Sequence, residues 1–192
     1  MKITYTTPPS QEATLTRTES ARLLALNRRN IDSLLQNHWM TLRLSDVAPL
    51  AARKYVSANV PLAVLRLGAP DYDHDGRRIG VAPSYSDEEF TESARKWWTG
   101  PVDQALDTGC MLVTTSSFIV GLLALESIEA TIQPSPSVKR SSFNVRLLAR
   151  VNNLVRNDVR VFETHPLVET LGHRIVPQRG SPLIVIAPGN QF

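Results

Sequence analysis

The chain lacks much of what metal-binding sites require. It holds a single cysteine among 192 residues, so no disulfide framework and no cysteine-based metal site are expected. The four histidines, His38, His74, His165 and His173, show no i,i+4 pair and no HExxH motif. We interpret them as structural or surface residues, and we expect neither a metal nor another cofactor.

Motifs typical of catalytic sites are missing as well. There is no GxSxG motif, no P-loop and no GxGxxG motif, and nothing in the sequence would activate Ser116 or Ser117 as a nucleophile. Residues 71–76 (Asp-x-Asp-x-Asp-Gly) resemble the start of a calcium loop, but Ala82 stands where that loop needs a glutamate. We therefore expect a hairpin turn there, and a protein that is not an enzyme.

Long apolar runs are scarce. The longest uncharged run, residues 108–125, is interrupted by four hydroxyl residues at 114–117 and by Gly121. This pattern predicts two buried strands and no membrane helix. Residues 1–11 lack the apolar core of a signal peptide, so we expect a cytoplasmic protein.

Charge of either sign is modest in total but unevenly distributed. The net charge is +3. Residues 1–60 hold eight basic residues (Lys or Arg) and four acidic residues (Asp or Glu). Residues 71–129 hold four basic and eleven acidic residues, and residues 137–160 hold six basic residues and one acidic residue. Two basic regions thus flank an acidic one. Nucleic-acid-binding proteins cluster positive charge in this way even when their total charge stays small.

The strongest functional signal lies in residues 18–37. Their pattern predicts two short helices joined by a tight turn, with Thr18 and Asn27 as N-caps and with Ala25 where a turn glycine is usual. The small and apolar positions are filled by Ala21, Leu24, Leu26, Ile31, Leu34 and Leu35. This division of faces is typical of a DNA-binding helix-turn-helix. An ordinary helical hairpin with a solvated basic face is the alternative.

In the DNA-binding interpretation, the second helix lies in the major groove of double-stranded DNA. Arginine can bond guanine and asparagine can bond adenine through two hydrogen bonds each. The predicted recognition residues are Asn27, Arg28, Arg29, Asn30, Asp32, Ser33 and Gln36. The predicted contacts to the DNA backbone are Thr18, Arg53 and Lys54. The last two lie in a third helix predicted from residue 45 or 46 to about residue 58, where they could equally complement the helix dipole.

A second basic segment covers residues 136–144 and precedes a strand predicted over 143–151. Its hydroxyl and amide groups can donate hydrogen bonds to phosphate oxygens or base edges, and its cations can neutralise phosphates. The predicted contacts of this second region with DNA are Lys139, Arg140, Ser141, Ser142, Asn144 and Arg146. Arg150 shares the predicted polar face of the strand. A solvated loop beside a charged strand is the alternative.

The remaining sequence is β-rich from about residue 61. Strands are predicted at 62–67, 78–82, 111–115, 118–125, 128–132, 143–151, 159–163 and 182–186. The near repeat of the first two predicts that they pair. Ser86 and Glu89 form a capping box for a helix through about Trp98. The predicted fold class is α+β: a mobile arm (1–14), a helical helix-turn-helix domain (15–60) and a β-rich α+β domain (61–192).

This order of features resembles the immunity repressors of cluster A mycobacteriophages. The chain length and the Arg28-Arg29-Asn30 start of the recognition helix agree with that family. The resemblance implies a repressor that maintains lysogeny, confers superinfection immunity and binds many short asymmetric sites, called stoperators. It also implies that residues 61–192 form a second DNA-reading domain. An asymmetric site suits a monomer with two unlike domains, and no heptad pattern marks a dimer, so we expect no obligate protein partner.

Two other functions stay open from the sequence. A ligand-responsive regulator would bind a metabolite in its C-terminal domain and dimerise. The first 60 residues are also similar to excisionase-type helix-turn-helix modules, which act as architectural DNA-binding proteins. Those modules usually carry a basic wing, whereas residues 41–44 hold only Arg43.

Overall fold

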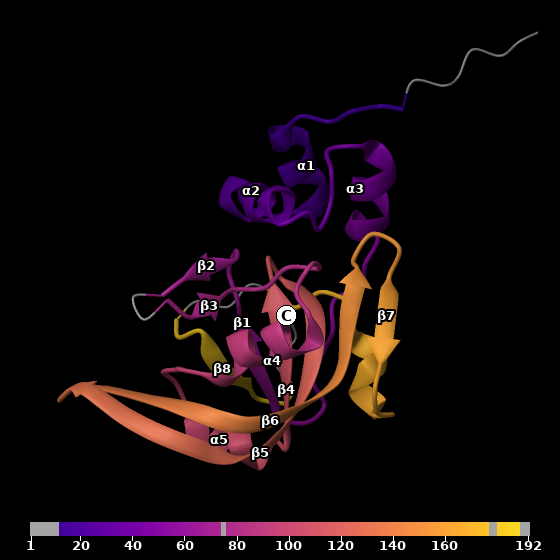
Figure 1. Cartoon of the computed structure of the whole chain (residues 1–192). Helices are drawn as coiled ribbons and strands as arrows, with labels where there is room; N and C mark the ends of the chain where they lie inside the picture. Colours follow the sequence, from indigo (N-terminus) through magenta and orange to yellow (C-terminus); the bar gives the residue numbers. More distant parts are fainter. Residues whose placement is uncertain (1–11, 74–75, 177–179, 189–192) are drawn as a thin grey trace, which may run out of the picture.

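The chain forms an N-terminal helical region followed by a β-rich α+β domain, as the sequence predicts (Figure 1). The computed structural model describes residues 12–73, 76–176 and 180–188. The helices are α1 (Arg17–Leu24), α2 (Arg28–Gln36), α3 (Leu44–Ala51), α4 (Asp87–Arg95), α5 (Val102–Asp107) and the 3-10 helix η1 (Pro166–Thr170). The strands are β1 (Leu62–Arg66), β2 (Asp71–Tyr72), β3 (Arg78–Ile79), β4 (Cys110–Thr115), β5 (Phe118–Ser135), β6 (Val138–Asn153), β7 (Asp158–Val161) and β8 (Leu183–Ile186). None of these helices is long and apolar enough to cross a bilayer.

The start of α1 corrects the prediction that Thr18 is an N-cap. Thr16 is the N-cap: its hydroxyl accepts a hydrogen bond from the Glu19 backbone N–H at 3.2 Å, and the Glu19 carboxylate accepts one from the Thr16 backbone N–H at 2.7 Å. Such a capping box needs an acid three residues after the cap, which Thr16 has and Thr18 lacks. Thr18 therefore lies inside the first turn of α1.

The predicted mobile arm, residues 1–14, lies mostly outside the described residues, and its last part is held in place. The backbone N–H of Leu44 donates to the Ala13 carbonyl at 2.8 Å, and the N–H of Leu15 donates to the Leu42 carbonyl at 2.7 Å. These bonds join the entry to α1 with the segment before α3, so residues 13 and 14 pack with the helical region.

The third helix is shorter than predicted. It ends at Ala51, and the chain beyond it pairs with a distant segment: the Arg174 N–H donates to the Lys54 carbonyl at 2.9 Å, and the Val56 N–H donates to the Arg174 carbonyl at 2.8 Å. These tertiary hydrogen bonds hold the segment extended. Arg53 and Lys54 consequently lie after the helix and not within it.

The sheet has the strand order β7-β6-β5-β4-β1-β8 and is mixed, because β1 runs parallel to β4 while the other neighbours are antiparallel. The predicted pairing of 62–67 with 78–82 is wrong. β1 is almost wholly buried and has a strand on each side, whereas β3 pairs with β2 in a separate hairpin. That β2–β3 hairpin is the turn expected from residues 71–76.

Two strands predicted as separate pieces form one long strand. β5 runs without interruption through residues 126–127, and it pairs with β6 through several register shifts. One shift sets Leu123 against Leu147 next to the Leu122–Ala149 pair, so Leu148 is an extra residue in β6. Such a bulge changes the side-chain alternation beyond it. Both faces of β6 are covered here, and Arg150 is buried against the start of α4, contrary to the predicted exposed polar face.

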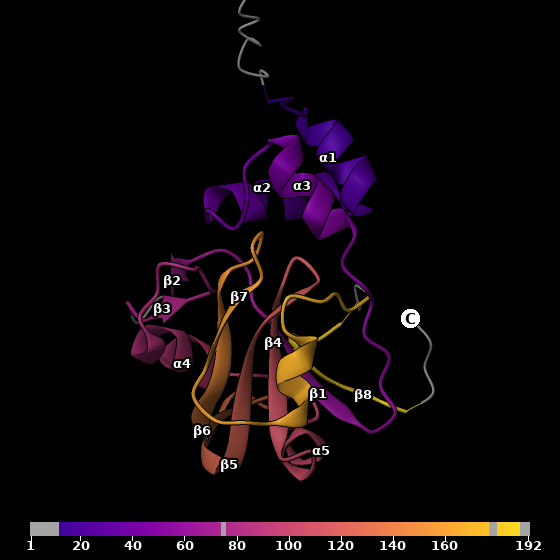
Figure 2. The same cartoon turned by 90° about the vertical axis from the view of Figure 1, so that its right-hand side faces the viewer.

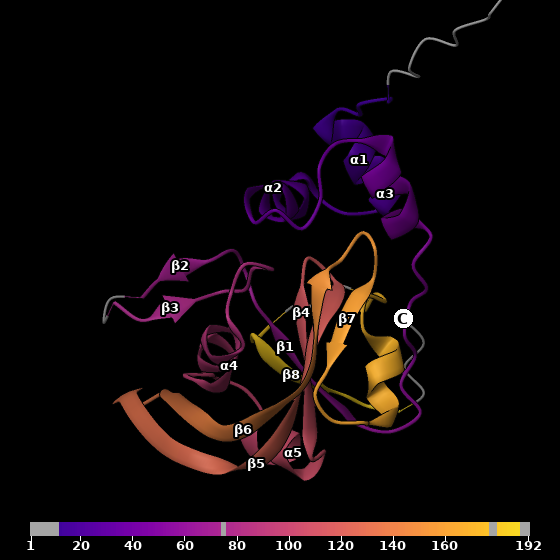
Figure 3. The same ribbon diagram turned by 45° about the vertical axis from the view of Figure 1, so that its right-hand side comes forward.

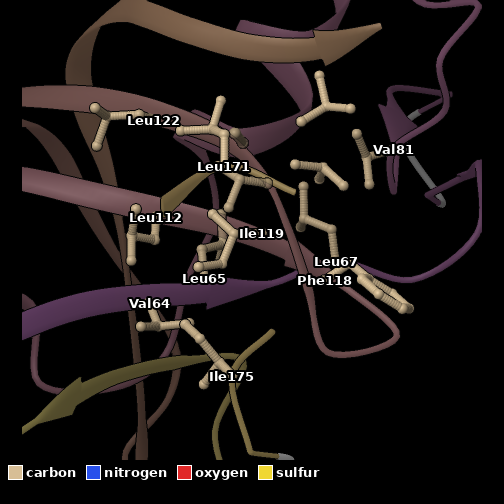
Figure 4. Close-up of a cluster of buried hydrophobic side chains, with 14 of the residues drawn as sticks. Val64, Leu65, Leu67, Val81, Leu112, Phe118, Ile119, Leu122, Leu171 and Ile175 are labelled. Carbon is tan, nitrogen blue, oxygen red and sulfur yellow. The ribbon is translucent and has the colours of Figure 1, made fainter. Parts of the chain in front are cut away.

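The main core lies where β1, β4 and β5 meet. Figure 4 shows Val64 and Leu65 beside Leu112, Ile119 and Leu122. Helix α4 begins with the predicted Ser86 capping box. The sequence analysis missed α5 and η1, which are six and five residues long and carry too short a periodic pattern to be recognised.

Candidate nucleic-acid interface

The turn between α1 and α2 has three residues, a length that is usual in a helix-turn-helix. Ala25 adopts a left-handed conformation with φ 49°, in the place where glycine is usual. Leu26 is buried and fills the angle between the helices. Asn27 caps α2 as predicted: its side-chain oxygen accepts a hydrogen bond from the Asn30 N–H at 2.8 Å.

Helix α2 divides into a buried stripe and a polar face. Ile31 and Leu34 are fully buried, as predicted, and Leu35 is half-buried. The polar face consists of exposed Asn27, Arg28, Arg29 and Gln36 and half-buried Asn30, Asp32 and Ser33. The residues predicted to read DNA thus lie on one helix and point away from its packed side.

Two members of this polar face have partners inside the helical region. Asp32 accepts a hydrogen bond from the Arg17 Nε at 2.8 Å, which ties α2 to α1. The side-chain amide of Asn37 donates to the Ser33 carbonyl at 2.7 Å and to its hydroxyl at 3.4 Å. Arg28 and Arg29 have no ion pair among the described residues. The face therefore keeps two exposed guanidinium groups at the positive end of the helix.

Figure 2 shows α2 lying over one end of the sheet. A cleft of about 1030 Å³ lies between α2 and the β-rich domain. The α2 side of this cleft is lined by Asn27, Arg29, Asn30, Asp32, Ser33 and Gln36. The opposite side includes Arg66, Gly68 and the β4–β5 turn at Ser116 and Ser117. All the predicted recognition residues except Arg28 therefore face a recess whose second wall belongs to the β-rich domain, which the sequence pattern did not indicate.

The helical region is held against the sheet by a buried arginine. The Arg174 guanidinium donates to the Leu24 carbonyl at the end of α1, and it lies over the rings of Tyr55 at 4.6 Å and Phe118 at 5.4 Å. Burial lowers the pKa of Arg174. The Ser116 hydroxyl adds a hydrogen bond to the Asn30 carbonyl of α2 at 3.1 Å. The sequence analysis missed Arg174, because nothing near it in the chain shows that it contacts the helical region.

Arg53 also takes part in attaching the helical region to the β-rich domain. Its guanidinium donates to the carbonyls of Leu154 and Val155, both at 3.3 Å, in the turn between β6 and β7. Burial lowers the pKa of Arg53. Both bonds come from the same terminal nitrogen of a half-buried side chain, so the contact of Arg53 with the DNA backbone stays a prediction. Lys54 is exposed, and its ammonium has no ion pair within the part of the chain that the structure describes.

The second predicted region splits into exposed and buried residues. Ser141 and Ser142 are fully buried: the Ser141 hydroxyl lies 3.1 Å from that of Thr131, and the Ser142 hydroxyl donates to Glu129 at 2.9 Å. Neither can reach DNA in this conformation. The cause is the antiparallel bridge between Ser141 and Trp98, which covers this part of β6.

Arg146 and Asn144 are exposed but engaged with neighbours. Arg146 forms ion pairs with Glu126 at 3.2 Å and with Glu163, and the Asn144 amide donates to the Ser127 hydroxyl at 2.9 Å. Lys139 and Arg140, in contrast, are exposed and have no ion pair among the residues described. The predicted second contact therefore reduces to these two cations, near the end of the β5–β6 hairpin.

Comparison of the chain with protein-family models, with curated proteins and with solved structures finds no match. The described residues hold no group of three or more His, Cys, Asp or Glu side chains arranged to bind a metal ion. The candidate interface therefore consists of the α2 face, the cleft beside it and the basic end of the β5–β6 hairpin.

Proposed function

We propose that this protein is a sequence-specific, double-stranded DNA-binding transcriptional repressor that acts as a monomer. The observation that carries the proposal is the polar face of α2. It places Arg28, Arg29 and Asn30 at the start of a capped helix, which follows a three-residue turn and packs through Ile31 and Leu34. In helix-turn-helix proteins, the N-terminal residues of the recognition helix contact base edges.

The proposed binding mode places α2 in the major groove, with Arg29 or Arg28 on guanine and Asn30 on adenine. A groove has a sugar-phosphate wall on each side, so one wall would enter the cleft between α2 and the sheet. Arg29 and Ser117 line that cleft, and their guanidinium and hydroxyl groups are suited to phosphate oxygens. Lys54 would contact the backbone outside the cleft.

The biological role follows from the resemblance to phage immunity repressors. Residues 1–60 would supply the base-reading helix, and the β-rich domain would add a second contact through Lys139 and Arg140. Two unlike domains on one chain match an asymmetric operator or stoperator better than a palindrome. The proposed role is maintenance of lysogeny and superinfection immunity in the cytoplasm of a bacterial host.

In vitro selection of duplexes from a random pool tests the proposal. The full chain should enrich one asymmetric sequence, and Arg29→Ala should relax the preference at one base pair. The Arg22→Ala variant is the matched control, because Arg22 is exposed on α1, outside the polar face of α2. A pool that stays random with the wild-type chain would overturn the proposal.

One observation favours a second candidate, a ligand-responsive regulator. The cleft of about 1030 Å³ is at the upper end of the volumes typical of small-molecule sites, and it is lined by both parts of the protein. A ligand there would change the position of α2 relative to the sheet. Sedimentation separates the candidates, because a stable dimer favours the ligand-responsive regulator and a monomer favours the repressor.

A further inference from the structure

The β5–β6 hairpin extends far beyond the rest of the sheet. We call residues 126–146 the ribbon, and residues 131–140 the ribbon tip. Figures 1 and 3 show the ribbon reaching away from the body at the lower end of the sheet, whereas α2 lies over the upper end. At about 3.3 Å per residue, the ten residues from Glu126 to Ser135 span roughly 30 Å.

The base of the ribbon is anchored to the body. The Ser141 N–H donates to the Trp98 carbonyl at 3.0 Å, and the Trp98 N–H donates to the Ser141 carbonyl at 2.9 Å. The Glu129 carboxylate accepts hydrogen bonds from Arg95 at 2.5 Å and from Ser142 at 2.9 Å. The bond from Arg95 lowers the pKa of Glu129, so this acid stays ionised and paired. The base of the ribbon is thus bonded to the body of the protein, and the ribbon tip projects from it.

The ribbon tip combines positive charge with exposed apolar groups. The sequence has no Asp or Glu between residues 130 and 157, and Lys139 and Arg140 are exposed on the second strand. On the facing strand and the turn, Ile132 is 40% exposed, and Pro134 and Pro136 are also exposed. A hairpin end that only faces water does not need apolar side chains, and a base-reading surface needs hydrogen-bond donors that proline lacks.

We propose that the ribbon tip enters the minor groove of DNA and bends the duplex, which deepens the proposed function and depends on it. Lys139 and Arg140 lie against the phosphates, while Pro134 and Pro136 act as an apolar wedge at a base step. The minor groove is only about 6 Å wide, so both phosphate walls lie close to cations on a ribbon inserted there. Apolar wedges in this groove unstack base steps and bend DNA by roughly 20–90°.

The test measures bending and affinity on the same DNA. The duplex is the sequence enriched by the full-length wild-type chain, with a fluorescence donor and acceptor at its two ends. Wild-type protein should raise the energy-transfer efficiency, because bending brings the ends together. The double variant P134S/P136S should lose most of this rise and should weaken binding less than about fivefold, since the phosphate contacts remain. Distamycin, which fills the minor groove, should also abolish the rise.

Two controls keep the outcomes separate. P61S/P188S changes two other exposed prolines and should bend the DNA as the wild-type chain does. K139R/R140K keeps both charges and should also bend it. Selective binding without any bend, or a bend that P134S/P136S leaves unchanged, would overturn the ribbon proposal and leave the repressor function intact. Failure to enrich any duplex would overturn both.

Discussion

The two basic regions of this protein present their cations in different ways. On α2, Arg28 and Arg29 belong to a short helix that is capped, packed on Ile31 and Leu34, and accompanied by amide side chains. On the ribbon tip, Lys139 and Arg140 are accompanied by prolines and an exposed isoleucine. In the proposed function the two regions would therefore have different roles, because a rigid polar face suits base recognition, whereas a basic apolar tip suits non-specific contact and deformation of DNA.

The contrast between the α2 face and the ribbon tip requires that α2 is held firmly against the β-rich domain. Arg174→Ala removes the hydrogen bond to the Leu24 carbonyl and two ring contacts, and it leaves that carbonyl without its partner. The free energy of unfolding should fall by about 2–4 kcal/mol, measured by urea denaturation. Arg156→Ala, at an exposed position of the β6–β7 turn, should change it by less than about 0.5 kcal/mol. Equal effects of the two variants would show that Arg174 does not hold the helical region.

The next largest expected effect is the loss of DNA affinity when a base-reading residue of α2 is changed. Arg29→Ala should weaken binding to the selected duplex by about 1–3 kcal/mol and relax the preference at one base pair. Arg29→Lys keeps the charge but cannot form two parallel hydrogen bonds, so it should lose the same preference with less loss of affinity. Unchanged binding by the alanine variant to its fixed site would remove Arg29 from the reading set.

The ribbon tip should affect affinity without affecting sequence preference. Arg140→Ala should weaken binding similarly on selected and random duplexes, and it should lower the slope of log K against log salt by about one. Fluorescence anisotropy over a series of salt concentrations measures this slope. Arg146→Ala is the comparison variant, since Arg146 is already paired with Glu126 and Glu163 and should change the slope less. A slope equal to that of the wild-type chain would exclude Arg140 from the interface.

The smallest effect concerns the turn before α2. The left-handed conformation of Ala25 is sterically strained for alanine but not for glycine, so Ala25→Gly should raise the free energy of unfolding by about 1 kcal/mol. Thermal unfolding measures the change, and DNA selectivity should stay as in the wild-type chain. Ala52→Gly is a suitable control, because Ala52 is exposed and in a right-handed conformation, where glycine brings no such gain. A destabilised Ala25→Gly protein would contradict this account of the turn.

Local signals predicted the helical region well. The cap at Asn27, the stripe of Ile31 and Leu34 and the capping box at Ser86 follow from neighbouring residues, and the structure confirms all three. The misplaced cap at Thr18 is a two-residue error of the same local kind. Local signals could not predict which polar side chains are exposed to solvent. Ser141, Ser142 and Arg150 look like polar surface in the sequence but are buried by segments distant in the chain, at the Trp98 bridge and at the start of α4.

The sequence alone determined that a helical region with capped helices precedes a β-rich domain, because caps, helical periodicity and strand patterns depend on residues within a few positions of one another. Only the tertiary structure decided which cations stay free. Arg53, Arg150 and Arg174 donate hydrogen bonds to backbone carbonyls of distant segments, because a buried carbonyl requires a donor. Arg28, Arg29, Lys139 and Arg140 stay exposed because no such carbonyl or carboxylate in the described structure reaches them.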